Sequence, residues 1–410
     1  MLRWILPFIF LFLIDWYVFQ AIKTVFKSKT ILYAYIVITL GVLIYLVYFF
    51  STISRGNGQN FTTLYSMGLF ILFYVPKLII VFFLLGEDLF RLFEGVFHSF
   101  RKTNTEAFFH GRRGFISKIS LGVAAIPFAS IVYGIFVGRY NYKVIKQTLF
   151  YDDLPDGFDG TTITHISDIH SGSFDNPEKI DYAIDLINEQ NSDLVLFTGD
   201  IVNTHASEMD PWIGAFKKIH KPKLGKYSVL GNHDYGDYIN WSSKEAKQQN
   251  LEDLKALQKD IGFDLLLNEN RFIEKDGERI ALIGVENWGI GGFKKAGDLK
   301  KASSKVDKDD FKILMSHDPS HWNEEVINDD YHYHLTLSGH THGMQFGIEI
   351  PGWFKWSPVK WRYKHWAGIY KELGQYINVN RGFGYLAFPG RVGIWPEITV
   401  IELKKGKKPV

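Results

Sequence analysis

The first 139 residues contain four long apolar stretches, which constrain the fold more than any other feature of the chain. They cover residues 2–19, 31–50, 64–85 and 119–137. A helix needs about 20 mostly apolar residues to cross a bilayer, so each stretch is long enough to span a membrane. The sequence therefore predicts an all-α transmembrane region of four helices over residues 1–139. There are two alternatives. The first stretch could be a cleaved signal peptide, or the whole region could be a buried soluble helical domain.

Charged residues interrupt two of these stretches. Asp15 lies in the first stretch, and Lys77 follows Pro76 in the third. Charged groups are costly in the hydrocarbon core, and they usually face other helices or a polar cavity. We therefore expect Asp15 and Lys77 to point toward neighbouring helices or toward the interface.

The distribution of Lys and Arg between the spans predicts the orientation of the chain. Basic residues are enriched between spans one and two and between spans three and four. Cytoplasmic loops carry the excess of such residues. Arg139, Lys143 and Lys146, directly after the last span, argue the opposite way. The balance predicts a multi-pass membrane protein whose polar part lies outside the cytoplasm.

The polar part begins after a segment that we interpret as a linker, residues 140–160, which ends in an acidic run rich in turn residues. The chain has no cysteine, which excludes disulfides, thiolate metal sites and cysteine nucleophiles. Its formal net charge is only +2, which provides no overall positive field to attract nucleic acid. We therefore expect no nucleic-acid partner.

Residues 161–410 have the pattern of an α/β domain. Short apolar runs rich in β-branched residues predict strands over 161–166, 194–198, 226–230, 279–285, 311–315 and 334–337. Polar segments with helical periodicity predict helices over 177–190 and 243–261.

Potential metal ligands follow five of these strands directly. They are Asp168 and His170, Asp200, Asn232, His317, and finally His340 and His342. Loops beyond strand ends converge on one crevice in α/β folds, so these side chains can meet. Each motif alone is more often a turn or a helix cap. Together they form a ligand set of carboxylates, imidazoles and one amide, which suits Mn, Fe or Zn.

The ordered series Asp-x-His, Gly-Asp, Gly-Asn-His-Asp, His and Gly-His-x-His resembles the calcineurin-like metallophosphoesterase family. Further runs, Gly343-Met344-Gln345 and Asn380-Arg381-Gly382 among them, are similar to a membrane-associated bacterial branch that contains the YkuE and YaeI phosphoesterases. The resemblance implies an αββα sandwich of two packed mixed sheets flanked by helices over residues 161–410.

The same resemblance implies the role of each ligand. Asp168, His170 and His342 bind a first divalent metal ion, Asn232, His317 and His340 bind a second, and Asp200 bridges both. The family's second motif commonly ends in Asp where this sequence has Asn203. In the family the residue at that position usually contacts the ligands and does not bind the metal. The difference therefore concerns the surroundings of the ligands and not the binding of the metal ions.

Two such ions would activate a bridging hydroxide for in-line attack at phosphorus, with no serine or cysteine nucleophile. The resemblance places His233 over the phosphoryl group as a proton donor, and Asp234 is expected to accept a hydrogen bond from its ring. Both are therefore catalytic candidates. Arg381 and Arg391 are either phosphate contacts or ordinary structural arginines.

The predicted function is hydrolysis of a phosphate ester or pyrophosphate of a lipid-linked or envelope substrate by a membrane-anchored enzyme. A cytoplasmic-face pyrophosphohydrolase of the UDP-diacylglucosamine type is an alternative, and so is a non-catalytic membrane scaffold or sensor. Residues 351–366 mix aromatic and basic side chains. This composition suits either a membrane interface or a loop packed on the core.

Overall fold

The structure, a computed structural model, describes residues 2–53, 56, 58–101, 106–350 and 352–408. The chain divides into two compact units, which are described separately. One unit contains residues 1–54 and 62–136, and the other contains residues 55–61 and 137–410. Arg55, a basic residue between the second and third predicted spans, and Pro351, the first residue of the aromatic and basic segment, lie outside the described residues.

The first unit consists of four helices, as predicted. They are α1 (Leu2–Val25), α2 (Lys29–Thr52), α3 (Phe61–Arg101) and α4 (Glu106–Phe136). Each contains a window that is long and apolar enough to cross a membrane. Helices α3 and α4 extend well past the predicted spans, so much of the basic connection between spans three and four is helical rather than loop.

The charged residues within the spans face other helices, which confirms their predicted direction. Lys77 Nζ lies 2.6 Å from Asp15 Oδ1, and both side chains are almost fully buried. The hydroxyl of Tyr74 donates to the other oxygen of Asp15 at 3.1 Å. Pairing lowers the cost of placing charges in an apolar environment, so the ion pair is compatible with a membrane-spanning bundle.

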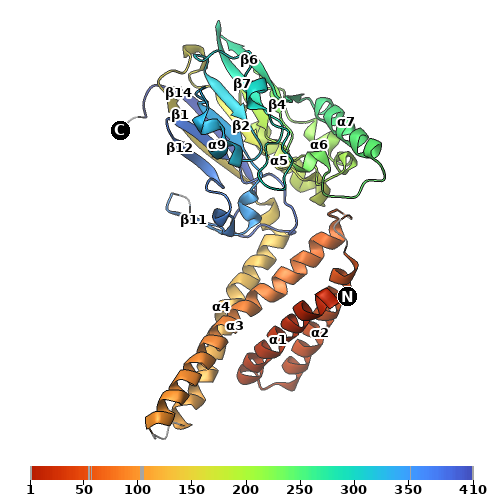
Figure 1. Cartoon of the computed structure of the whole chain (residues 1–410), viewed down its shortest axis with the longest axis vertical. Coiled ribbons are helices and arrows are strands. Elements are labelled where there is room, and N and C mark those ends of the chain that lie inside the picture. Colours follow the sequence, from red (N-terminus) through yellow and green to blue (C-terminus); the bar gives the residue numbers. More distant parts are fainter. Residues whose placement is uncertain (1, 54–55, 57, 102–105, 351, 409–410) are drawn as a thin grey trace. The chain divides into compact units, whose positions relative to one another are not determined.

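The second unit is built on two six-stranded mixed sheets (Figure 1). The first sheet has the order β1 (Lys143–Tyr151), β14 (Glu397–Lys405), β2 (Thr162–Ile166), β3 (Leu194–Phe197), β4 (Lys226–Ser228) and β5 (Asp264–Leu265). The second has the order β12 (Gly368–Glu372), β13 (Gln375–Val379), β9 (Leu335–Ser338), β8 (Lys312–Met315), β7 (Glu278–Gly284) and β6 (Glu269–Lys275). A separate hairpin pairs β10 (Ile348–Ile350) with β11 (Phe354–Trp356).

The sheets pack face to face and carry helices on their outer sides. Along β8, Ile313 and Met315 join the core between the sheets, whereas Leu314 joins a second cluster with Trp322. Alternate residues of a strand point to opposite faces, so this pattern defines the layers. The helices are α5 (Pro177–Glu189), α6 (Ile213–Phe216), α7 (Lys244–Asp260), α8 (Leu299–Ala302) and α9 (Ser320–Glu324). The predicted αββα architecture is therefore correct.

The prediction that residues 140–160 form a linker is wrong for the central part of this segment. Residues 143–151 form β1, which pairs in parallel with β14 along its whole length. The strand lies at the edge of its sheet, and most of its residues are exposed or half-buried. Its apolar pattern is therefore weak, and its partner lies at the far end of the sequence.

Candidate metal centre

Every predicted ligand lies just beyond the carboxyl end of a strand. Strands β2, β3 and β4 are parallel neighbours in the first sheet, and β8 and β9 are parallel neighbours in the second. Their loops therefore open at matching edges of the sandwich. Many of the ligand residues adopt a left-handed backbone with positive φ, namely Asp168, His170, Asp200, His340 and His342. Such conformations cost energy for residues other than glycine, and they concentrate at functional sites.

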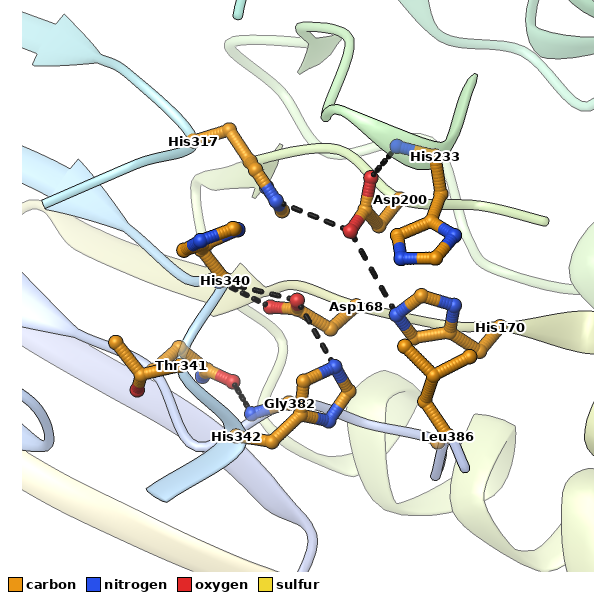
Figure 2. A network of polar contacts seen from close by, with 12 residues as sticks. Asp168, His170, Asp200, His233, His317, His340, Thr341, His342, Gly382 and Leu386 are labelled. Atoms are coloured by element: carbon orange, nitrogen blue, oxygen red, sulfur yellow. Dashed lines mark hydrogen bonds and ion pairs between the residues drawn. The ribbon is translucent and has the colours of Figure 1, made fainter. Parts of the chain in front are cut away.

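The side chains form two groups whose ligand atoms lie within 4.8 Å of one another. The first group is Asp168, His170 and His342, and the second is Asp200, His317 and His340. Asp200 connects them, because its Oδ2 lies 3.6 Å from His170 Nε2 and 3.1 Å from His317 Nε2 (Figure 2). The carboxylate of Asp200 therefore lies between the two groups.

Backbone and side-chain acceptors fix the orientation of two of the imidazoles. The Nδ1–H of His170 donates to Asn203 Oδ1 at 3.0 Å, and that of His317 donates to the carbonyl of Thr198 at 2.7 Å. Each ring therefore directs its Nε2 into the centre, where that nitrogen could coordinate a metal ion. Histidine ligands of metal ions are commonly held in this way.

The centre fits a divalent cation. The buried Nε2 atoms of His170, His317 and His342 face the carboxylates of Asp200 and Asp168 at 3.1–3.6 Å, without a well-aligned hydrogen bond among the described residues. Buried polar groups normally have such a hydrogen bond. Burial lowers the pKa of His317, but the carboxylate of Asp200 outweighs it and raises that pKa to about 10. The carboxylate of Asp200 therefore stabilises positive charge on His317. A cation bound between these side chains would provide that positive charge instead.

Asn232 lies beside the second group. The Nδ1–H of His340 donates to Asn232 Oδ1 at 2.7 Å, and the amide nitrogen of Asn232 donates to the hydroxyl of Tyr238 at 2.7 Å. The hydroxyl of Tyr363 donates to the other ring nitrogen of His340 at 2.8 Å. Sequence reasoning missed both tyrosines. Tyr363 belongs to the aromatic and basic segment, whereas no motif marks Tyr238.

His233 lines a cavity together with Asp200, Asn232 and His340, but its ring does not contact Asp234. The ring Nδ1–H donates to the carbonyl of Asn203 at 2.8 Å, which leaves Nε2 for a ligand in the cavity. The carboxylate of Asp234 instead accepts from the backbone N–H groups of Asp200, Ile201 and Gly231. The predicted contact between Asp234 and the His233 ring is therefore wrong. Asp234 stabilises the turns that present Asp200 and Asn232.

Arg381 and Arg391 have structural partners. Arg381 pairs with Glu397 and with Glu349. Arg391 is fully buried, and its guanidinium donates to the carbonyl of Gly384 at 2.6 Å. Both arginines hold the loop after β13, so the structural alternative stated for them is the correct one.

The glycine before His340 allows the two sheets to approach each other at the centre. A Cβ atom at Gly339 would lie 1.9 Å from Ser167 Oγ and 2.1 Å from Asp168 Oδ2. Gly339→Ala is expected to displace Asp168, abolish tight Mn²⁺ binding and destabilise the domain by about 1–3 kcal/mol. Calorimetric Mn²⁺ titration and urea unfolding test this. Gly214→Ala is the matched control, because its Cβ would meet nothing within 4 Å, and equal Mn²⁺ binding by the two variants would contradict the expectation.

A cavity of about 530 Å³ opens beside both groups. Its polar lining includes Asp200, Asn232, His233, His340 and His342. The rest of its wall is mainly apolar and includes Phe293, Met344, Val359, Trp361 and Leu386. The centre is therefore accessible to a ligand that has both a polar and an apolar part.

Comparison with known proteins identifies the family of this chain. A model of the probable calcineurin-like phosphoesterase transmembrane domain matches residues 2–139, and the calcineurin-like phosphoesterase model matches residues 161–344. The chain is 30% identical over 278 residues to the uncharacterized metallophosphoesterase YkuE of Bacillus subtilis, covering 66% of this chain and 89% of that protein.

More distant similarities are found as well. A transmembrane protein with metallophosphoesterase domain from Danio rerio is 27% identical over 284 residues, which cover 67% of this chain and 60% of that protein. The crystal structure of a 5'-nucleotidase precursor from Thermus thermophilus aligns with a TM-score of 0.36 at 13% identity, over 60% of this chain and 54% of that one. The relationship to YkuE and the two family models together establish that this membrane protein belongs to the calcineurin-like metallophosphoesterases, which are metal-dependent phosphoester hydrolases.

Proposed function

We propose that this enzyme hydrolyses a phosphate ester or pyrophosphate of a membrane lipid or lipid-linked envelope precursor. The observation that carries the proposal is the mixed wall of the cavity. Ligand side chains and His233 form its inner part, and Met344 and Trp361 lie on its rim with 58% and 76% of their surface exposed. A phosphate headgroup with an attached apolar chain matches both parts.

We assign two divalent ions, Mn, Fe or Zn, to the centre. Asp168, His170 and His342 would hold one ion, and Asn232, His317 and His340 the other, with Asp200 shared. Bound ions of this kind polarise a phosphoryl oxygen and supply an activated water at neutral pH. His233, oriented by the carbonyl of Asn203, would donate a proton or hydrogen bond to the leaving oxygen.

The aromatic and basic segment at residues 352–366 supports a lipid-facing site. Val359 and Trp366 are buried in a small core, so part of the segment packs on the domain. In contrast, Trp353 on the β10–β11 turn is 81% exposed, and Phe354 beside it is 47% exposed. Lys360 is also exposed. Aromatic rings beside cations favour the headgroup region of a bilayer.

A substrate comparison tests the lipid assignment. Full-length protein in nanodiscs with Mn²⁺ is expected to prefer a lipid pyrophosphate over a water-soluble phosphomonoester. Trp353→Ala should lower lipid turnover about 10-fold and leave hydrolysis of a soluble aryl phosphodiester unchanged. Activity on the soluble diester alone would contradict the lipid assignment. Inactivity on all substrates with metal bound would favour the scaffold function.

We further propose that the catalytic unit lies outside the cytoplasm of a bacterial cell. The proposal rests on the excess of Lys and Arg between spans one and two and between spans three and four. Protease added to intact spheroplasts should then degrade residues 137–410. Protection of this region would instead place the site in the cytoplasm, where the pyrophosphohydrolase alternative acts.

A further inference from the structure

The catalytic unit includes a short segment from the membrane-spanning part of the sequence. Residues 55–61, which connect α2 to α3, belong to the same compact unit as residues 137–410. The backbone N–H of Asn240 donates to the carbonyl of Gly56 at 3.2 Å. Two spans, α3 and α4, separate this segment from residue 137, so both lie on the same side of a bilayer.

Gln59 makes two specific contacts in this unit. Its Nε2 donates to Ser173 Oγ at 3.1 Å, and its Oε1 accepts from the backbone N–H of Ala387 at 2.6 Å. A side-chain amide has both a donor and an acceptor, which these two contacts use. Gln59 therefore bridges the loop after β2 and the loop after β13.

The first contact leads to a ligand of the metal centre. Asn203 Nδ2 donates to the same Ser173 Oγ at 3.1 Å, and Asn203 Oδ1 accepts from the Nδ1–H of His170 at 3.0 Å. Both Ser173 and Asn203 are buried. An aspartate at this position would have no N–H to donate to Ser173. The side-chain amide of Asn203 therefore connects His170 to Ser173, and Ser173 in turn contacts Gln59.

The second contact reaches the wall of the cavity. Ala387 has a left-handed backbone with a φ of 62°, which costs energy for a residue with a side chain. Its neighbour Leu386 lines the cavity, where Figure 2 shows it near the ligand side chains. The hydrogen bond from Ala387 to Gln59 helps to hold this conformation and therefore the position of Leu386.

We propose that Gln59 is a positioning residue of the hydrolase site. It acts through Ser173 and Asn203 on the His170 imidazole, and through Ala387 on the apolar wall. A loop between two membrane spans is in this way part of the catalytic unit, and the spans do more than anchor it. The inference rests on the metal-dependent hydrolase activity but not on the lipid nature of the substrate.

The test compares Gln59→Ala with Gln249→Ala in full-length, detergent-solubilised protein. Gln249 lies on α7, and its side-chain amide donates to Asp253 on the exposed face of the same helix. Outer contacts of metal ligands commonly contribute 10–100-fold to metal affinity or activity, so Gln59→Ala should weaken Mn²⁺ binding about 10-fold by calorimetry. The kcat for an aryl phosphodiester should fall by a similar factor, with a smaller change in KM and an unchanged unfolding temperature.

A double-mutant cycle separates the two contacts. Ser173→Ala removes the route to His170 and keeps the bond to Ala387, so its effect on Mn²⁺ affinity should not add to that of Gln59→Ala. Additive effects would overturn the proposed route. Equal Mn²⁺ affinity of Gln59→Ala and Gln249→Ala would overturn the positioning role, whatever the substrate of the enzyme.

Cross-linking provides a measurement that does not depend on a folded alanine variant. The natural chain has no cysteine, so a Gln59→Cys and Ala387→Cys pair can be joined selectively by a short bis-maleimide in native membranes. Mass spectrometry should identify the linked peptides. Their absence, with both cysteines labelled singly, would contradict the contact on which the inference rests.

Discussion

Asp200→Asn is expected to reduce hydrolysis of an aryl phosphodiester by at least about 1000-fold, since metal ions can supply several kcal/mol of transition-state stabilisation. The carboxylate lies between His170, which belongs to the first ligand group, and His317, which belongs to the second. Its Oδ1 also accepts from the backbone N–H of His233 at 2.8 Å. The amide keeps the size of the side chain but removes the charge that both ligand groups share.

The measurement combines kcat with metal content. Asp200→Asn should bind less Mn²⁺ than the natural protein when analysed by inductively coupled plasma mass spectrometry. Asp210→Asn, an exposed substitution of the same kind, should retain full activity and metal content. If Asp200→Asn kept about a tenth of the natural kcat, Asp200 could not be the shared ligand.

His233→Ala is expected to lower kcat by about 100–1000-fold while Mn²⁺ binding stays unchanged, because general acid catalysis contributes on this scale. The Nδ1 of His233 is occupied by the carbonyl of Asn203. Only Nε2 remains for the substrate, so the side chain acts on the reacting group rather than as a ligand. The loss should be greater for alkyl leaving groups, which need a proton, than for nitrophenolate, which leaves readily.

His220→Ala serves as the control, since His220 is exposed. Rates for a series of phosphodiesters with different leaving groups distinguish the roles of His233. A uniform loss across the series would indicate a contact to a phosphoryl oxygen instead of the leaving oxygen. Loss of Mn²⁺ from His233→Ala would contradict the assignment altogether.

The sequence by itself determined the architecture of this protein, because the relevant signals are local. Four apolar stretches of membrane length predicted α1 to α4. Ligand residues directly after apolar runs predicted the edge of the sandwich where the centre lies. For example, β8 ends at Met315, two residues before His317. Because His317 follows β8 directly in the chain, it must lie near the end of that strand. The sequence alone was enough to place it there.

Only the tertiary structure decided which side chains support the ligands. Asp234 is adjacent to His233, yet it binds three backbone N–H groups, and the ring of His233 is held by a carbonyl from the loop after β3. Residues 143–151 joined a sheet because β14, near the end of the chain, provides their hydrogen bonds. Gln59 reaches Ser173 over 114 positions. Hydrogen bonds between distant segments depend on how the chain folds back on itself, and local sequence patterns do not record this.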